Sequence, residues 1–98
     1  QAMTTNVIYI ANRGTQITFT LPILSSIGDF LLIVGEGVGG WLLDLNVGQQ
    51  VRVGSQITTV TTGSVAATNQ ADALYLICTQ ANTLWTTFCG PQGNLVIV

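Results

Sequence analysis

The sequence predicts an all-β fold, which we expect to be a compact antiparallel β-sandwich or jelly-roll-like domain of about eight to nine short strands. Three observations lead to this prediction. Turn signals built from Gly, Asn and Ser recur about every eight to twelve residues, the spacing typical of sandwiches and barrels. The runs between them are rich in β-branched and aromatic residues, without an apolar stripe of helical period. Only 6% of the 98 residues are charged, against about 25% in an average soluble domain.

Nine runs have the composition of strands, and they cover residues 6–11, 16–21, 30–34, 41–45, 49–53, 56–61, 73–79, 83–88 and 94–98. Alternation in the run 41–45 puts Trp41 and Leu43 on one face and Asp44 on the opposite, solvent side. The run 30–34 is instead apolar on both faces, as in a strand that is covered on each side. One of its faces would then join the subunit core and the other a neighbouring subunit.

Two connecting segments can be interpreted. The glycine-rich segment 35–40 follows one strand and precedes another, so it lacks the helix N-terminus that a phosphate-binding loop needs. We expect a flexible hairpin connection there. Residues 65–73 are rich in Ala but carry no helical periodicity, and we expect a loop or a single turn.

The net charge and the hydropathy pattern argue against nucleic acid as a partner and against insertion into a membrane. The net charge of −2 comes from two basic and four acidic residues, so the basic footprint of a nucleic-acid-binding protein is absent. No apolar run reaches the length of a membrane span, and the N-terminus has no signal-peptide pattern. Because a monomer of this size needs surface charge to remain unassociated, we expect much of its outside to be buried in an oligomer.

The sequence contains few residues of the types that carry out catalysis. The chain has no histidine, which removes the usual general base and the commonest metal ligand. Asp29 and Asp72 directly precede strands, so a turn or strand-end role is expected for each. Glu36 and Asp44 are not paired with another carboxylate by any motif. We therefore expect no catalytic residues, no cofactor, no metal site within the chain and no enzymatic activity. A metal ion on the axis of an oligomer, held by carboxylate or Asn oxygens from each subunit, is left open, and no local motif points to one.

The two cysteines are expected to be unbonded to one another within the chain. The run 73–88 forms a hairpin whose tip lies at Ala81 and Asn82, which places Cys78 opposite Trp85. Cys89 then lies about four residues along the ladder, roughly 13 Å away, whereas a disulfide needs Cα atoms within about 7 Å. Both are interpreted as small buried residues, with an intersubunit disulfide of Cys89 as the alternative.

Three features admit a structural and a sugar-binding interpretation. Trp41 and Trp85 are expected to anchor the core or an interface, and the alternative is a platform on which a sugar ring stacks. The Thr-rich tract 58–64 is expected to be a solvent-facing strand that avoids charge, and the alternative is contact with a glycan.

An ordered series of short motifs covers residues 17–98, and together they carry a resemblance. The motifs are Thr20-Leu21-Pro22, Gly28-Asp29, Ile33-Val34-Gly35-Glu36-Gly37-Val38-Gly39-Gly40-Trp41, Asn46-Val47-Gly48-Gln49, Gly54-Ser55, Ser64, Thr68-Asn69-Gln70-Ala71-Asp72, Leu76-Ile77-Cys78, Ala81-Asn82-Thr83-Leu84-Trp85 and Gly93-Asn94-Leu95-Val96-Ile97-Val98. In this order and spacing the chain resembles C-terminal modules of phage tail fibres and related virion proteins. It is similar also to the modules that end bacterial and giant-virus collagen-like surface proteins.

The resemblance implies a β-rich homotrimer attached to a fibre shaft on a virion or an extracellular surface. The chain would be a single module, 1–98, excised from the C-terminal end of a longer fibre protein. It would attach to a host-cell surface receptor, either a glycan or a protein. The alternatives are a trimerisation or folding module without receptor binding, and a structural or decoration protein of the virion.

Two sets of candidate residues follow. The chain ends in four apolar residues, which must be buried, and we expect them at the threefold axis of the trimer: Leu95, Val96, Ile97 and Val98. Receptor contacts are expected on loops, where polar groups sit on flexible backbone. The segments 35–40 and 68–72 are the best candidates, with Glu36, Asn69 and Gln70 as contacting residues. A cleft between subunits is the alternative site.

Overall fold

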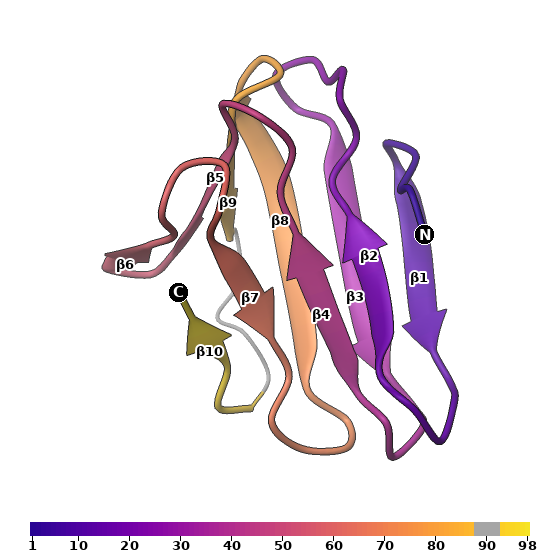
Figure 1. Cartoon of the computed structure of the whole chain (residues 1–98). Coiled ribbons are helices and arrows are strands. Elements are labelled where there is room, and N and C mark those ends of the chain that lie inside the picture. Colours follow the sequence, from indigo (N-terminus) through magenta and orange to yellow (C-terminus); the bar gives the residue numbers. More distant parts are fainter. Residues whose placement is uncertain (88–92) are drawn as a thin grey trace.

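The computed structural model describes residues 1–87 and 93–98, and within them all regular structure is β-strand (Figure 1). Ten strands form two mixed sheets in a compact domain. The strands are β1 (Val7–Ala11), β2 (Ile17–Thr20), β3 (Phe30–Gly35), β4 (Trp41–Asp44), β5 (Gln50–Val53), β6 (Gln56–Ile57), β7 (Ser64–Ala66), β8 (Ala73–Gln80), β9 (Leu84–Thr87) and β10 (Val96–Ile97). The predicted all-β class is confirmed.

The two sheets pack face to face with the core between them (Figure 1). The six-stranded sheet has the order β1-β3-β8-β9-β5-β6, and the four-stranded sheet has the order β10-β7-β4-β2. Alternation along each strand sends every second side chain into the core. The fully buried side chains include Leu31, Ile33, Trp41, Leu43, Val51, Val65, Leu74, Leu76 and Trp85.

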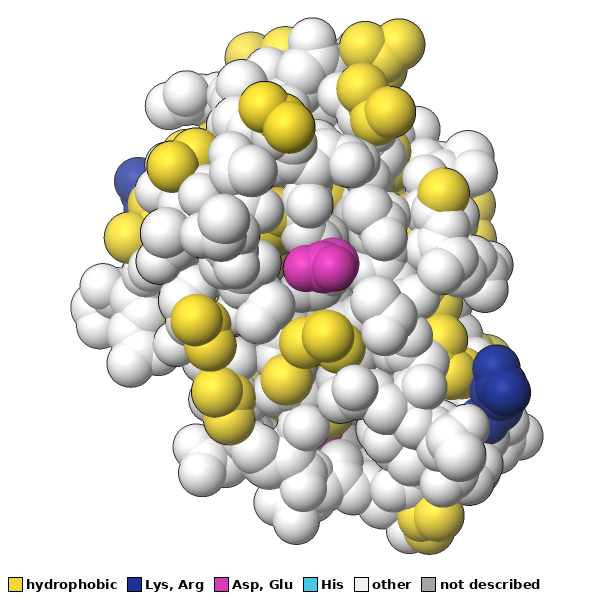
Figure 2. Space-filling view, in the orientation of Figure 1, with side chains coloured by type: hydrophobic (Ala, Val, Ile, Leu, Met, Phe, Trp, Pro, Cys, Tyr) yellow, Lys and Arg dark blue, Asp and Glu magenta, His cyan; other side chains and the backbone are white. Residues whose placement is uncertain are grey.

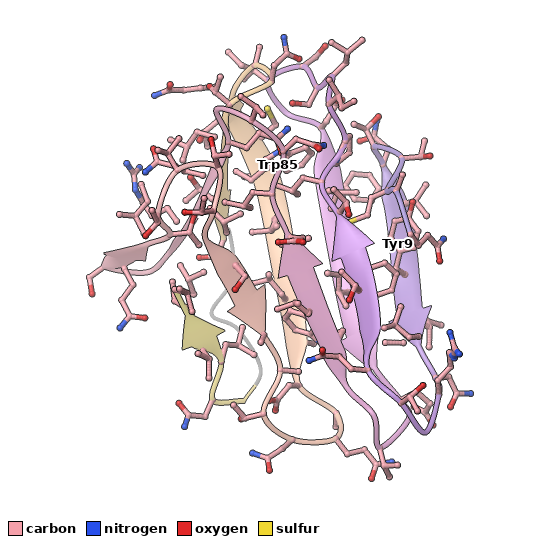
Figure 3. All side chains as sticks on the ribbon, viewed as in Figure 1. Tyr9 and Trp85 are labelled. Atoms are coloured by element: carbon pink, nitrogen blue, oxygen red, sulfur yellow. The ribbon has the colours of Figure 1, made fainter. Side chains whose placement is uncertain are left out.

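The aromatic side chains help to join the layers. The rings of Tyr9 on β1 and Phe19 on β2 lie 5.3 Å apart with an interplanar angle of 56°, a tilted contact between the two sheets. Figure 3 places Tyr9 beside β1 and β2, and Trp85 toward the upper ends of β8 and β9.

The sheets are mixed, so the expected antiparallel arrangement is wrong at three strand pairs of the described chain. β1 pairs with β3, β2 with β4, and β5 with β9 in parallel. The first two pairs share one register, because Val7 pairs with Leu31 and Ile17 pairs with Trp41, a separation of 24 residues in both cases. Residues 7–20 and 31–44 therefore form two stacked turns of a coil that passes from one sheet to the other.

Segment 35–40 was predicted to be a hairpin connection, and this prediction is wrong. It leaves β3 in the six-stranded sheet and enters β4 in the four-stranded sheet. Its backbone packs on the equivalent segment of the preceding turn, where Gly39 N–H donates to the carbonyl of Arg13 at 2.9 Å. A Cβ atom on Gly37 or Gly39 would overlap the backbone of Arg13 or Thr15. The glycines are needed for this close approach.

Two further expectations need correction. The expected loop or turn over 65–73 is confirmed for residues 67–72, but residues 65 and 66 belong to β7 (Ser64–Ala66), which lies between β4 and β10, and residue 73 begins β8. The tertiary position of Val65, which is fully buried, outweighs the weak β-propensity of the Ala-rich segment. The expected solvent-facing strand over 58–64 is also absent, because β6 ends at Ile57 and Thr58 is buried with its hydroxyl accepting from Val51 N–H at 2.9 Å.

The outer face of the four-stranded sheet mixes polar and apolar residues. Thr20, Asp44 and Ser64 form a polar row across β2, β4 and β7. The neighbouring row contains Thr18, Leu42, Ala66 and Val96. Asp44 is exposed there, which confirms its predicted solvent-facing position. Figure 2 shows this face, with a single acidic group near its centre and apolar groups below and beside it.

Candidate functional site

Three connections meet at one end of the sandwich, the lower end in Figure 1: the β1–β2, β3–β4 and β7–β8 loops. This end brings together the expected receptor-contacting residues Glu36, Asn69 and Gln70. Gln70 Nε2 donates a hydrogen bond of 2.8 Å to the carbonyl oxygen of Glu36, across 34 residues of sequence. All three residues are exposed. We call Glu36, Asn69 and Gln70 the end-loop cluster.

Asp72 organises the loop that carries Asn69 and Gln70. Its side chain is 4% exposed, and its Oδ2 accepts hydrogen bonds from Thr68 N–H at 2.9 Å and Asn69 N–H at 3.0 Å. Its carbonyl oxygen accepts from Gly35 N–H at 3.0 Å. Asp72 therefore ties the β7–β8 loop to the end of β3, and its predicted strand-end role is confirmed.

The backbone at this loop is constrained. Ala71 has a φ of 74°, in the left-handed region that costs a non-glycine residue about 1–2 kcal/mol. This turn reverses the chain between the exposed Gln70 and the buried Asp72. From the other side, Gly93 lies so close to the Asp72 carboxylate that a Cβ atom would overlap it, and the Thr68 hydroxyl donates to the Asn94 carbonyl. The loop is thus held by the segment that leads to β10.

The end-loop cluster offers amide donors and acceptors, together with one carboxylate, on a fixed backbone. Such groups match the hydroxyls of a neutral glycan or the backbone of a polar peptide. The Asp72 and Asp29 carboxylates bind backbone groups of their own loops: Asp72 accepts from Asn69 N–H at 3.0 Å, and Asp29, in the β2–β3 loop, accepts from Ser26 N–H at 2.9 Å. Across residues 1–87 and 93–98, no three His, Cys, Asp or Glu side chains gather in a metal-binding group.

Both tryptophans are fully buried, at 0% exposure, which confirms their structural interpretation and removes them as sugar-stacking platforms. Trp41 Nε1 donates to the Asp72 carbonyl at 2.9 Å, so the core itself supports the loop end. Trp85 Nε1 has no acceptor among the described residues.

Cys78 pairs in register with Trp85, as predicted from the hairpin. It is unbonded to another cysteine, 1% exposed, and its sulfur lies 3.2 Å from the Ser25 hydroxyl. This agrees with the interpretation of Cys78 as a small buried residue. The predictions made for Cys89 lie outside the described residues.

The C-terminal residues divide between two roles. Leu95 and Ile97 pack against the core of their own chain, and β10 pairs with β7. Val96 and Val98 remain 47% and 57% exposed. Two of the four residues expected at a trimer axis are therefore already used within the subunit, and only Val96 and Val98 present a substantial apolar surface to a neighbour.

The opposite end of the sandwich carries an apolar surface that sequence reasoning missed. Ile23, Leu24 and Ile27 in the β2–β3 loop are 70%, 74% and 73% exposed, and Val47 in the β4–β5 connection is 88% exposed. Figure 2 shows apolar groups at this upper end. A groove of about 490 Å³ lies beside them, lined by Ala2, Met3, Thr20, Leu21, Pro22, Ile23, Leu24 and Asn46. The sequence did contain a signal for this surface, because Ile23, Leu24 and Ile27 are apolar residues in a segment with the composition of a turn.

A search of the described residues for a helix long and apolar enough to cross a membrane finds none. Comparison of the chain with models of protein families, with curated proteins and with solved structures finds no match in any of the three.

Proposed function

We propose that this chain is a non-enzymatic, homotrimeric module at the tip of a virion or extracellular surface fibre, and that it attaches to a receptor on a host-cell surface. The observation that carries the proposal is the end-loop cluster. Its residues come from two distant segments, are linked by the Gln70–Glu36 hydrogen bond, and are held by the buried Asp72. Such polar loops on a rigid scaffold are the usual place for recognition.

The composition supports the trimeric part of the proposal. With six charged side chains among 98 residues, the surface relies on Thr, Ser, Asn and Gln, which suits an assembled extracellular structure. Three copies would present three end-loop clusters on one particle. Weak binding of each cluster to a glycan or surface protein would then be strengthened by avidity, without additional contacts.

Binding to host cells and to a glycan array tests the proposal. We expect Gln70→Ala and Asn69→Ala each to reduce binding about tenfold or more, because every subunit of the trimer carries the substitution and its weakened end-loop cluster. Gln56→Ala is the matched control, since Gln56 is an exposed amide on β6, far along the sheet order from β3. Equal binding by all three variants would show that the end-loop cluster is not the receptor site.

The second candidate is a trimerisation or decoration subunit that binds no receptor. It is favoured by Ile23, Leu24, Ile27 and Val47, whose exposed apolar side chains suit a protein neighbour better than a sugar. In that case the isolated module would bind no cell or glycan, whereas its removal from the parent fibre would abolish assembly.

A further inference from the structure

The outer face of the six-stranded sheet is largely apolar over β1, β3 and β8, which run from one edge to the middle of the sheet. Ile8 pairs with Leu32, Ile10 with Val34, and Phe30 with Ile77, so that these six side chains share the face directed away from the core. We call them the outer apolar face. Ile8 and Ile10 are 57% and 64% exposed, and the other four are partly exposed.

The two outer faces of the sandwich differ in how they mix polar and apolar residues. The outer face of the four-stranded sheet interleaves two sets, the polar Thr18, Thr20, Asp44 and Ser64 and the apolar Leu42, Ala66 and Val96. The outer face of β1, β3 and β8 carries the six residues of the outer apolar face, with Tyr75 opposite Leu32 and no charged residue. A sheet that is apolar on both sides is normally covered on both sides, and this face is the more continuous apolar surface of the two.

We propose that the outer apolar face is the surface through which copies of this chain contact one another, so that the faces of three copies meet around a common axis. This inference rests on the proposed trimer and adds its location. Charge favours a second copy as the occupant, because bringing identical faces together places no like charges in contact. The charged residue of this sheet, Arg52, lies on β5, beyond β9, at the rim.

A lipid surface fits less well. Proteins that lie on membranes combine an apolar face with flanking Lys or Arg and with interfacial Trp. Here both tryptophans are buried and the strands of the outer apolar face carry no basic residue.

The area of the outer apolar face is sufficient for the centre of an interface but not for a whole one. The three strands β1, β3 and β8, about 4.8 Å apart and about five residues long at 3.3 Å each, give a flat footprint of roughly 240 Å². A standard stable interface buries about 800 Å² on each partner. The contact must therefore extend over a polar rim, for which β9 and β5 supply Thr86, Gln50 and Arg52.

The edge of the same sheet supports the proposal independently. β1 has one neighbour, β3, and its other side is an open edge of five residues without a charge or a proline. Open edges of this kind are usually protected, and the edge strands β6 and β10 are short, with two residues each. A second copy that covers Ile8 and Ile10 would shelter the β1 edge as well.

Solution mass, measured by light scattering across a dilution series, tests the inference. We expect three times 10.3 kDa for the wild-type chain, the monomer mass of 10.3 kDa for Ile10→Lys, and an unchanged trimer for Thr18→Lys on the opposite outer face. Ile10→Thr is a milder second variant, which should dissociate at higher concentration than the wild type. A denaturant titration of each variant checks that the chain is folded, which we expect since residue 10 is exposed.

The outcomes separate this inference from the proposed function. A folded Ile10→Lys variant that remains trimeric at every dilution would place the contact elsewhere and overturn the inference, while the trimer would stand. A wild-type chain that is monomeric throughout would overturn both, and flotation with neutral phospholipid vesicles would then show whether a lipid surface covers the face instead.

Discussion

The indole Nε1 of Trp41 donates a hydrogen bond of 2.9 Å to the backbone carbonyl of Asp72. This bond joins the first residue of β4, in one sheet, to the residue that precedes β8, in the other. It also holds the loop that carries Asn69 and Gln70 against the core. The position of the end-loop cluster thus depends on a buried side chain that no ligand would touch.

The two tryptophans allow this hydrogen bond to be measured. Both are fully buried, but Trp85 Nε1 has no acceptor in the described part of the chain. Each change to Phe removes similar volume, so we expect Trp41→Phe to lower the free energy of unfolding by about 1 kcal/mol more than Trp85→Phe. Urea titration followed by the fluorescence of the remaining tryptophan gives both values. Equal losses would mean that the Trp41–Asp72 bond contributes no net stability.

Asp72 should be the most sensitive carboxylate. Asp72→Ala leaves the N–H groups of Thr68 and Asn69 without their acceptor, and we expect a loss of about 2–3 kcal/mol in the free energy of unfolding. Asp72→Asn keeps one oxygen and should lose less. The control is Asp44→Ala, an exposed carboxylate on the outer face of the four-stranded sheet, which should change stability by less than about 0.5 kcal/mol. Similar losses at both positions would contradict the organising role of Asp72.

The glycines of the β3–β4 connection are predicted to be intolerant of a side chain. A Cβ at Gly37 or Gly39 would overlap the backbone of Arg13 or Thr15, so we expect Gly→Ala at either position to cost about 1–3 kcal/mol. Gly14→Ala is the matched change in the neighbouring β1–β2 loop, where nothing lies within 4 Å of the new methyl group. It should leave the thermal midpoint unchanged or slightly raised. A tolerated Gly39→Ala would show that the two turns of the coil are less closely stacked.

The C-terminal strand gives a test of how its apolar residues are divided. Ile97 packs against the core and Val96 points outward. We expect Ile97→Ala to lower the free energy of unfolding by about 1–2 kcal/mol, and Val96→Thr to leave it nearly unchanged. The reverse ranking of the two variants in unfolding would show that β10 is placed with the opposite face inward.

The sequence by itself determined the all-β class and the local roles that depend on near neighbours. Alternation in residues 41–45 correctly placed Asp44 outward, and the composition of residues 73–88 correctly predicted a hairpin with Cys78 opposite Trp85. The positions of Asp29 and Asp72 before strands correctly predicted strand-end roles. These features follow from the two-residue period of a strand and from turn chemistry, both of which act over a few residues.

Only the tertiary structure decided which strands became neighbours. The parallel register of 24 residues, the passage of segment 35–40 between sheets, and the burial of Val65 in β7 all depend on contacts between distant segments. The same holds for the meeting of Glu36 with Gln70 and for the gathering of the outer apolar face from β1, β3 and β8. The physical reason is that alternation tells which side chains share a face, whereas the partner of each face is selected by packing across the whole domain.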